Sequence, residues 1–307
     1  MKAREWGIFG LLGLIWGSSF LWIKIAVAEV GPFVLVSFRL LFGLVGLVTI
    51  MFLTKRAFPR DRKMWLRFLF MGVVNTAIPF TLISWGETKI DSSLASILNG
   101  SVPLFTIIIA HFWLHDEKIT FGRMAGLIVG FIGVIVLVSG DLNPEGLHGD
   151  LIGQLAVLLA AISYATAITF SRKYLRGSNP LLQAASTLLI ADSIMWLVTP
   201  FAERPMILPA LPITWLAIAW LGLLGTCTAY LMFFSLINAW GATRASLVTY
   251  VFPVIGLILG IIFLKEEADW RLLVGSALVI VSVLAVNFNQ LFRSAPATAP
   301  ASALASK

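Results

Sequence analysis

Apolar runs of about 20 residues, separated by short polar connections, fill most of the chain. A helix needs roughly 20 mostly apolar residues to cross a bilayer, so each run is long enough, or nearly so, to span one. The connections carry Gly-Pro, Asn-Pro and charged clusters, which are typical of turns. The pattern therefore predicts an all-α, polytopic membrane protein. Its ten expected transmembrane helices are Trp6–Val27, Phe33–Phe52, Trp65–Trp85, Ser92–Leu114, Phe121–Val138, Leu151–Phe170, Leu181–Val198, Ile213–Ile237, Ala245–Leu264 and Leu272–Phe288.

The two halves of the chain match each other. At an offset of 150 residues the matched pairs are Gly72 with Gly222, Thr76 with Thr226, Ala95-Ser96 with Ala245-Ser246, Pro103 with Pro253, and Asp116-Glu117 with Glu266-Glu267. Earlier in each half the offset is 148, which pairs Trp16 with Tyr164, Ser18 with Thr166, and Pro32 with Pro180. Because five helices is an odd number, the second copy must enter the membrane upside down. We expect one five-helix repeat at residues 1–141, an inverted second repeat at 142–292, and a disordered cytoplasmic tail at 293–307.

Such an inverted repeat has a physical use. Two copies related by an axis in the membrane plane can exchange conformations and so expose a central site to either side in turn. The pattern therefore favours a transporter. A duplicated scaffold or enzyme without a transport role is the alternative.

Composition agrees with the membrane class. The chain is 59% hydrophobic and only 12% charged, with a mean hydropathy of +0.95, whereas soluble domains carry about twice that share of charge. The net charge of +7 does not indicate a nucleic-acid partner, because the basic residues lie in short gaps between apolar runs. Cys227 is the only cysteine, which excludes an intrachain disulfide and a cysteine-rich metal site. We expect no metal and no cofactor.

The distribution of lysine and arginine predicts the orientation. With the N-terminus inside, sixteen of them fall on inner segments, five on outer segments, and Arg39 lies within a helix. Cytoplasmic loops carry such an excess, so both termini are expected in the cytoplasm. The first apolar run, Trp6–Val27, is long enough to span and no small-residue cleavage site follows it, so we expect an uncleaved first helix rather than a signal peptide.

Polar residues within the apolar runs are candidates for function, because they are costly in a bilayer. A stripe on the fourth helix contains Ser96, Asn99 and Pro103, and the ninth helix repeats it with Thr249 and Pro253. The prolines should break helical hydrogen bonds and free carbonyl groups towards the bundle interior. Plain helix packing is the alternative, since small and hydroxyl residues also hold membrane helices together.

Aromatic residues away from the predicted helix ends could form the walls of a cavity, or could equally belong to the packed core. A pocket of aromatics with a few hydroxyl and amide groups suits a small amphipathic solute. The expected solute-site residues are Trp16, Ser18, Trp22, Asn75, Asn99, Tyr164, Thr166, Tyr230, Thr249 and Tyr250.

Two ionisable residues inside the predicted helices are candidates for coupling or gating, together with Pro103 and Pro253. Asp192 lies near the middle of the seventh helix and could be a proton site or a hydrogen-bonded structural group. Arg39 could snorkel, pair with Asp192 or hold a substrate carboxylate, and the structural role is favoured. Its mate in the second half is Thr187, so the two halves differ at this position.

The motif from Trp16 to Phe20, followed by Pro32 and Arg39, resembles the EamA-type members of the drug/metabolite transporter superfamily. The runs from Ala95 to Glu117 and from Ala245 to Glu267 resemble the same family, and the resemblance extends from about Trp6 to Phe288. It implies ten helices, inverted repeats, and export of amino acids, related metabolites or drugs across the bacterial inner membrane.

The sequence thus predicts a secondary transporter of the inner membrane, exporting amino acids or similar small amphipathic metabolites by alternating access. Its partners are a small-molecule solute and the bilayer, while proton coupling and a homodimer are left open. Efflux or facilitated passage of drugs or other metabolites is the alternative. A membrane-embedded lipid enzyme is less favoured, because His111, His115 and His148 are scattered over both sides, and no catalytic residues are expected.

Overall fold

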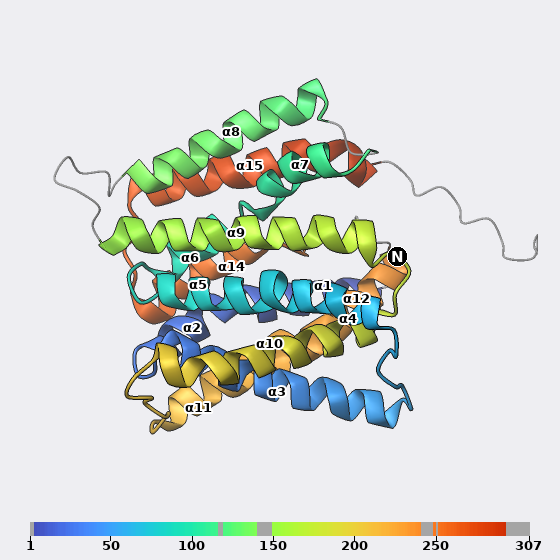
Figure 1. The fold of residues 1–307 in the computed structure, drawn as a ribbon. Helices are drawn as coiled ribbons and strands as arrows, with labels where there is room; N and C mark the ends of the chain where they lie inside the picture. The colour runs from blue at the N-terminus through green and yellow to red at the C-terminus, as the bar shows by residue number, and fades with distance from the viewer. Residues whose placement is uncertain (1–2, 116–118, 140–148, 241–247, 250, 293–307) are drawn as a thin grey trace, which may run out of the picture.

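The computed structural model describes residues 3–115, 119–139, 149–240, 248–249 and 251–292, and every regular element in these ranges is a helix (Figure 1). In chain order the helices are α1 (Ala3–Gly17), α2 (Ser19–Val27), α3 (Pro32–Leu53), α4 (Arg62–Met71), η1 (Gly72–Ala77), α5 (Ile78–Gly86), α6 (Ser92–Asn99), α7 (Val102–Trp113), α8 (Phe121–Val138), α9 (Gly149–Tyr174), α10 (Pro180–Ala202), α11 (Pro212–Ala219), η3 (Trp220–Thr228), α12 (Ala229–Trp240), α14 (Val251–Leu259), η5 (Gly260–Leu264) and α15 (Trp270–Phe292). The elements η1, η3 and η5 are π-helical.

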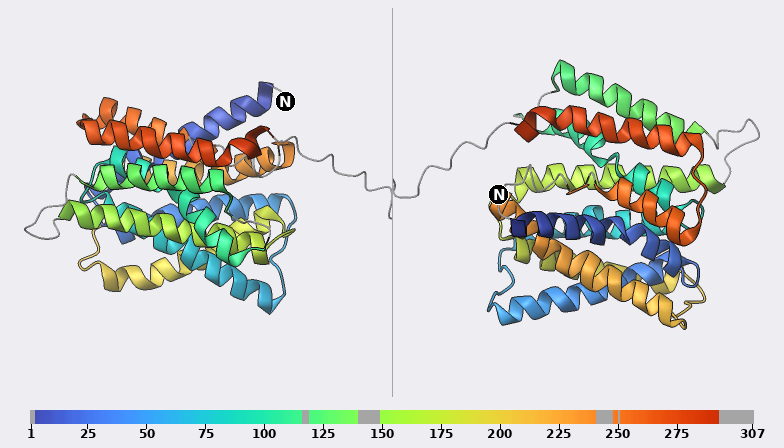
Figure 2. Two further views of the ribbon diagram at one scale, coloured as in Figure 1. Left: turned by 90° about the horizontal axis from the view of Figure 1, so that it is seen from above. Right: turned by 180° about the vertical axis from the view of Figure 1, so that it is seen from behind.

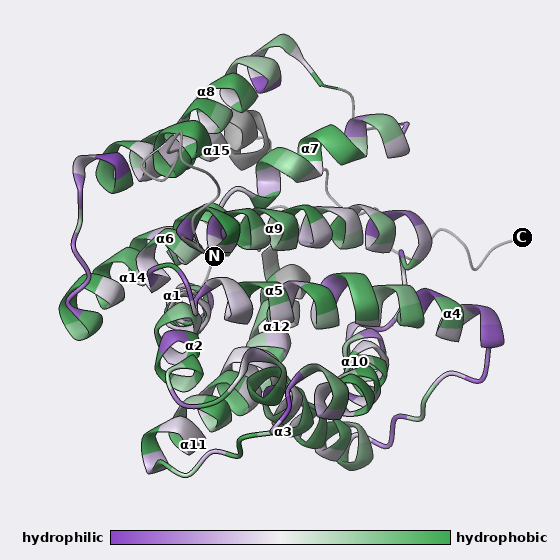
Figure 3. Cartoon of the chain, turned by 60° about the vertical axis from the view of Figure 1, so that its left-hand side comes forward, coloured by the Kyte–Doolittle hydropathy of each residue, from purple (hydrophilic) through white to green (hydrophobic). Residues whose placement is uncertain are grey.

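The helices have the length and composition of membrane spans. Within the described ranges, eight helical stretches are long and apolar enough to cross a bilayer, and further apolar helical stretches cover Val251–Leu264 and Trp270–Ser282, the latter within α15. Apolar residues cover the helices and polar residues gather at their ends (Figure 3). Large apolar side chains such as Phe52 and Phe121 point outwards, as they would towards lipid. The chain is a polytopic membrane protein, as predicted.

Helices from distant parts of the sequence lie side by side. The views from above and behind show α8 along α15 at one edge of the bundle (Figure 2). Glycines allow this approach: a Cβ added at Gly133 would lie 3.0 Å from the carbonyl oxygen of Gly275, and one added at Gly275 would lie 3.0 Å from that of Gly133. The Ser282 hydroxyl also donates to the Gly126 carbonyl at 2.6 Å.

Several long helices are interrupted. The π-helical stretches η1 and η3 begin near Gly72 and Gly222, the glycines that the sequence pairs at an offset of 150. A π turn widens the helix and displaces its hydrogen bonds, and such turns are common at functional sites. The stretch Ser92–Trp113 is broken between α6 and α7, directly before Pro103. A hydropathy pattern gives no indication of the π turns, because it carries no information on hydrogen-bond register.

The paired glycines Gly72 and Gly222 make corresponding close contacts with the backbone of the other half of the chain. A Cβ at Gly72 would lie 3.1 Å from the carbonyl oxygen of Thr187, and one at Gly222 would lie 2.8 Å from that of Arg39. Arg39 and Thr187 are themselves the pair at an offset of 148. The third long helix of one half thus packs on the second long helix of the other half in two corresponding places. The predicted boundary at residues 141 and 142 and the tail at 293–307 lie outside the described residues.

Replacing Gly222 with alanine is expected to destabilise the protein by about 1–3 kcal/mol, the usual cost of overpacking. The new methyl would lie 2.5 Å from Cβ of Phe42 and 2.8 Å from the Arg39 carbonyl, so the backbones of α3 and η3 must separate. Thermal unfolding in detergent, followed by size exclusion, would measure the loss. Gly7→Ala is the control because nothing lies within 4 Å of its added Cβ. Equal melting temperatures for the two variants would contradict the close contact.

Candidate functional site

Arg39 is buried in the bundle interior. Its side chain is only 6% exposed, its Cζ lies 3.9 Å from the centre of the Phe80 ring, and its Nε donates to the Thr226 hydroxyl at 3.5 Å. Tyr164 and Tyr230 are near enough to interact electrostatically with the guanidinium. Among the described residues, no carboxylate lies within ion-pairing distance of Arg39. α3 therefore presents a positive charge to α5, η3, α9 and α12 without a counter-ion in contact.

A small cavity lies between η1, α10 and α12. Its volume is about 40 Å³, room for about one water molecule. A side-chain hydrogen bond joins Asn75 and Tyr230 at its wall, and the Thr187 hydroxyl there is buried without a hydrogen-bond partner. The lining residues are Met71, Asn75, Gln183, Ala184, Thr187, Leu188 and Tyr230. The cavity thus brings together two predicted site residues, Asn75 and Tyr230, next to the mate of Arg39.

The predicted site residues of the first helix pack against the second half. The Trp16 indole donates to the Gly225 carbonyl at 3.0 Å, and its ring contacts Phe233 and Phe252. The Ser18 hydroxyl donates to the Ile15 carbonyl at 2.9 Å. Trp220 contacts both Ser18 and Trp22, the other two predicted residues of the first helix. Its indole donates to the Ser18 hydroxyl at 3.1 Å, and its ring centre lies 5.4 Å from that of Trp22.

At the break between α6 and α7, Asn99 is the last residue of α6 and its amide oxygen is buried without a hydrogen-bond partner. Pro103 lies in the first turn of α7. A Cβ at Gly100 would lie 2.7 Å from Cγ of Pro253, so α14 packs directly on the break. Asn99 and Pro103 thus flank the break on which Pro253 packs.

Other predicted residues lie apart or outside the described chain. The Thr166 hydroxyl donates to Ile162 in its own helix. Thr249 is partly buried just before α14, and Tyr250 lies outside the described residues.

Asp192 is also buried, at 7% exposure. One of its carboxyl oxygens lacks a hydrogen-bond partner, and a side-chain hydrogen bond links the carboxyl to Trp196 one turn further along α10. The contacts of Arg39 are Phe80 and Thr226, so the structure shows no ion pair between Arg39 and Asp192.

One end of the bundle carries contacts that the sequence did not indicate. Three carboxylates there, those of Glu29, Glu203 and Glu266, accept hydrogen bonds from backbone N–H groups at helix N-termini in the other half of the chain. We call these three residues the carboxylate latch. Glu203 accepts from Phe33 at 2.8 Å and from Val34 at 3.1 Å, at the start of α3.

The other two latch residues follow the same arrangement. Glu266 accepts from the Ser92 and Ser93 amides at 2.8 and 2.9 Å and from both serine hydroxyls, at the start of α6. Glu29 accepts from Ala210 at 2.7 Å, from Leu211 at 3.0 Å and from the Thr214 hydroxyl, at the start of α11. A helix N-terminus favours negative charge, so these contacts join the halves at the left-hand ends in Figure 1.

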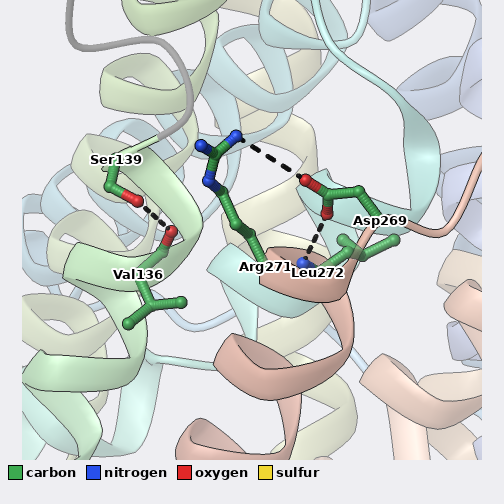
Figure 4. A network of polar contacts seen from close by, with 5 residues as sticks. All are labelled: Val136, Ser139, Asp269, Arg271 and Leu272. Carbon is green, nitrogen blue, oxygen red and sulfur yellow. Dashed lines mark hydrogen bonds and ion pairs between the residues drawn. The ribbon is translucent and has the colours of Figure 1, made fainter.

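Asp269, at the same end, makes only local contacts (Figure 4). It accepts the Leu272 amide at 2.7 Å and so caps its own helix, α15. Its ion pair with Arg271 is 3.9 Å long and about half exposed, so it contributes little. Ser139 likewise bonds within α8, to the Val136 carbonyl at 2.7 Å. Asp269 is therefore not part of the latch.

The EamA-like transporter family matches this chain twice, at residues 5–139 and 151–288. The chain belongs to the EamA-like transporter family. Similar proteins include an uncharacterized transporter of Archaeoglobus fulgidus, 25% identical over 92% of this chain and 98% of its own length. The uncharacterized inner membrane transporter YedA of Escherichia coli is 27% identical over 96% of this chain and 94% of its own length. The uncharacterized transporter YoaV of Bacillus subtilis is 26% identical over 90% and 94%.

A solved crystal structure has the same fold, with a TM-score of 0.67 at 16% identity, covering 94% of this chain and 99% of the other. The family match confirms the resemblance noted from the sequence motifs. This EamA-family protein is thus a multi-pass membrane transporter, and its family consists of transporters rather than enzymes.

Proposed function

We propose that this EamA-family protein is a secondary transporter of the bacterial inner membrane. It exports amino acids or similar small amphipathic metabolites by alternating access. In this proposal ten helices form two inverted five-helix halves, with both termini in the cytoplasm. The double family match and the paired contacts of Gly72 with Thr187 and of Gly222 with Arg39 support the repeat.

The observation that carries the substrate class is the buried, unpaired guanidinium of Arg39. A charge in a membrane interior without a counter-ion is costly and marks a functional position. A guanidinium binds a carboxylate through two parallel hydrogen bonds, so a solute with a carboxylate would supply the missing counter-ion. Phe80, Tyr164 and Tyr230 around the charge supply the apolar and hydroxyl contacts that an amphipathic solute needs.

Alternating access requires one end to be closed while the other is open. The carboxylate latch joins the halves at the ends of the helices where the proposed topology places the outer side, and it supports closure there. Asn75, Asn99 and the π-helical stretches lie deeper, where the Asn75 amide and the unpartnered Asn99 amide oxygen could bind a solute after rearrangement.

Counterflow in proteoliposomes tests the proposal. Each labelled amino acid is paired with the amine that lacks only its carboxylate. We expect saturable counterflow of one or more amino acids and none of the matching amines, because Arg39 would have no partner in an amine. Counterflow of neither class from folded protein would contradict the amino-acid substrate. Counterflow of amines alone would instead favour efflux of cationic drugs by the same fold.

A further inference from the structure

Glu87 has a buried carboxyl group that the proposed solute site does not use. It directly follows the span Arg62–Gly86, its side chain has no exposed surface, and both carboxyl oxygens are buried without a hydrogen-bond partner in the described structure. An ionised carboxylate held in this way would be an uncompensated buried charge, which is strongly unfavourable. The conformation described here therefore suits the protonated, neutral form.

The nearest cation does not neutralise this carboxyl group directly. The Lys24 ammonium donates to the main-chain carbonyls of Glu87 at 2.9 Å and of Ile90 at 2.6 Å. Burial raises the pKa of Glu87 well above its usual range, Lys24 partly opposes this, and Glu266 adds to it.

Few other charged groups act electrostatically on the Glu87 carboxyl. Arg39 acts on Glu87 from α3 and favours the ionised form weakly. Asp91, in the same loop, has its pKa raised by partial burial and by Glu266, and is also influenced by Lys24 and by Asp150 of α9. Among these groups Glu266 is the one that also holds the two halves together, through its bonds to Ser92 and Ser93.

We propose that Glu87 is a proton-binding site and that closing the latch end takes up one proton there. When the end opens, water reaches the carboxyl, its O–H bond breaks, and the proton passes to that water. The resulting carboxylate repels the carboxylate of Glu266, so it opposes re-formation of the contact between Glu266 and α6. Closure then requires a proton to return to Glu87. This inference rests on the proposed alternating-access function and adds a proton-dependent step to it.

The direction of the pH dependence follows from the raised pKa. The closed end holds the Glu87 proton more tightly than the open, hydrated end does. Closure is therefore fully favoured below the ordinary carboxyl pKa of about 4.5 and weakens as pH rises towards the raised value. In that interval the ratio of closed to open molecules should fall by up to about tenfold per pH unit.

Spin-label distances test the proposal without any solute. Labels on Ala28→Cys and Ala268→Cys, both exposed and on opposite halves, report the width of the latch end in a Cys227→Ala background. In nanodiscs between pH 5 and 9, we expect the fraction of molecules with the longer distance to grow with pH when Glu87 is unchanged. Glu87→Gln should keep the short distance at every pH, and Glu87→Asp should retain the pH response.

Asp192→Asn is the matched control, because it removes the other carboxyl that is buried among the described residues and should leave the pH response in place. The proposal is overturned if Glu87→Gln follows the wild-type curve, or if Asp192→Asn abolishes it. If Glu87→Gln fails to fold, a flat curve for Glu87→Asp would overturn the proposal and a shifted curve would support it.

Counterflow of the labelled amino-acid panel at pH 6 and pH 8 provides the second readout. The rates for Glu87→Gln should differ by less than twofold between the two pH values, while those for the wild type differ by several-fold. If no amino acid undergoes counterflow with wild-type protein, the proposed substrate class fails, whereas the spin-label curves still decide the role of Glu87.

Discussion

Replacing Arg39 with glutamine is expected to abolish counterflow of carboxylate solutes while leaving the folded protein as stable as the wild type. Glutamine is neutral but long enough to keep a hydrogen bond near Thr226, so the change removes mainly the charge. Hydrogen bonds to charged groups contribute about 1.5–3 kcal/mol each, and a guanidinium can form two with one carboxylate. The loss of affinity should therefore be at least about 100-fold, since 1.4 kcal/mol corresponds to tenfold.

The stability result separates this role from a structural one. Arg39 has no carboxylate in contact among the described residues, so Arg39→Gln breaks no ion pair within the protein. It also removes a buried charge, which by itself should not lower the melting temperature. Arg39→Lys keeps the charge but loses the planar pair of donors, and should retain part of the activity.

The measurements are the concentration dependence of counterflow and the melting temperature in detergent. Arg271→Gln is the matched control, because its ion pair with Asp269 is exposed and far from the site. A lowered melting temperature for Arg39→Gln with unchanged affinity would assign Arg39 to the fold rather than to the solute.

The sequence predicted the helices well because the bilayer imposes their length and apolar composition. The predicted helix Phe121–Val138 coincides with α8, and the predicted Trp6–Val27 agrees with α1 and α2 to within a turn. The offset of 150 residues also pairs Gly72 with Gly222, and the structure places both in corresponding close contacts. The count of ten crossings and the inversion stay predictions, because eight helical stretches in the described ranges are long and apolar enough to span.

The site was harder to predict, because its contacts join residues far apart in the chain. Trp16 was identified as a candidate, but its bond to the Gly225 carbonyl spans 209 positions and depends on how the halves pack. The burial of Arg39 was also not predictable from the sequence. The pattern was compatible with snorkelling and with pairing to Asp192. Glu266 was visible only as half of an acidic pair, and its role as a cap for α6 requires the fold.

Replacing Glu266 with glutamine is expected to loosen the latch end and expose residues that are now buried there. A glutamine has one acceptor oxygen and no charge, so it cannot bind both serine amides with the favourable charge–dipole interaction of the carboxylate. Loss of a helix cap costs about 0.5–2 kcal/mol, which would move the closed-to-open ratio by about 2- to 30-fold.

Labelling at Ser84→Cys by a membrane-impermeant maleimide, in a Cys227→Ala background at one fixed pH, measures this opening. Ser84 is fully buried one turn before Glu87, so its labelling rate should follow the open fraction. Glu267→Gln is the matched control, because Glu267 is the exposed next residue and caps no helix in the described structure. Equal labelling rates for the two variants would show that Glu266 does not hold the end closed.

Removing Glu203 as well should multiply the effect, because its bonds to α3 are independent of those of Glu266 to α6. Glu29 should keep its contacts with the start of α11 under mild acid. The hydrogen bond from Thr214 lowers its pKa, and those from Ala210 and Leu211 add to this against a partial effect of desolvation. A lowered carboxyl pKa means that the cap stays ionised as pH falls through the usual range and is lost only below it. Mild acid should therefore protonate Glu87 and favour closure without weakening Glu29, so the spin-label distance at the latch end should shorten as pH is lowered.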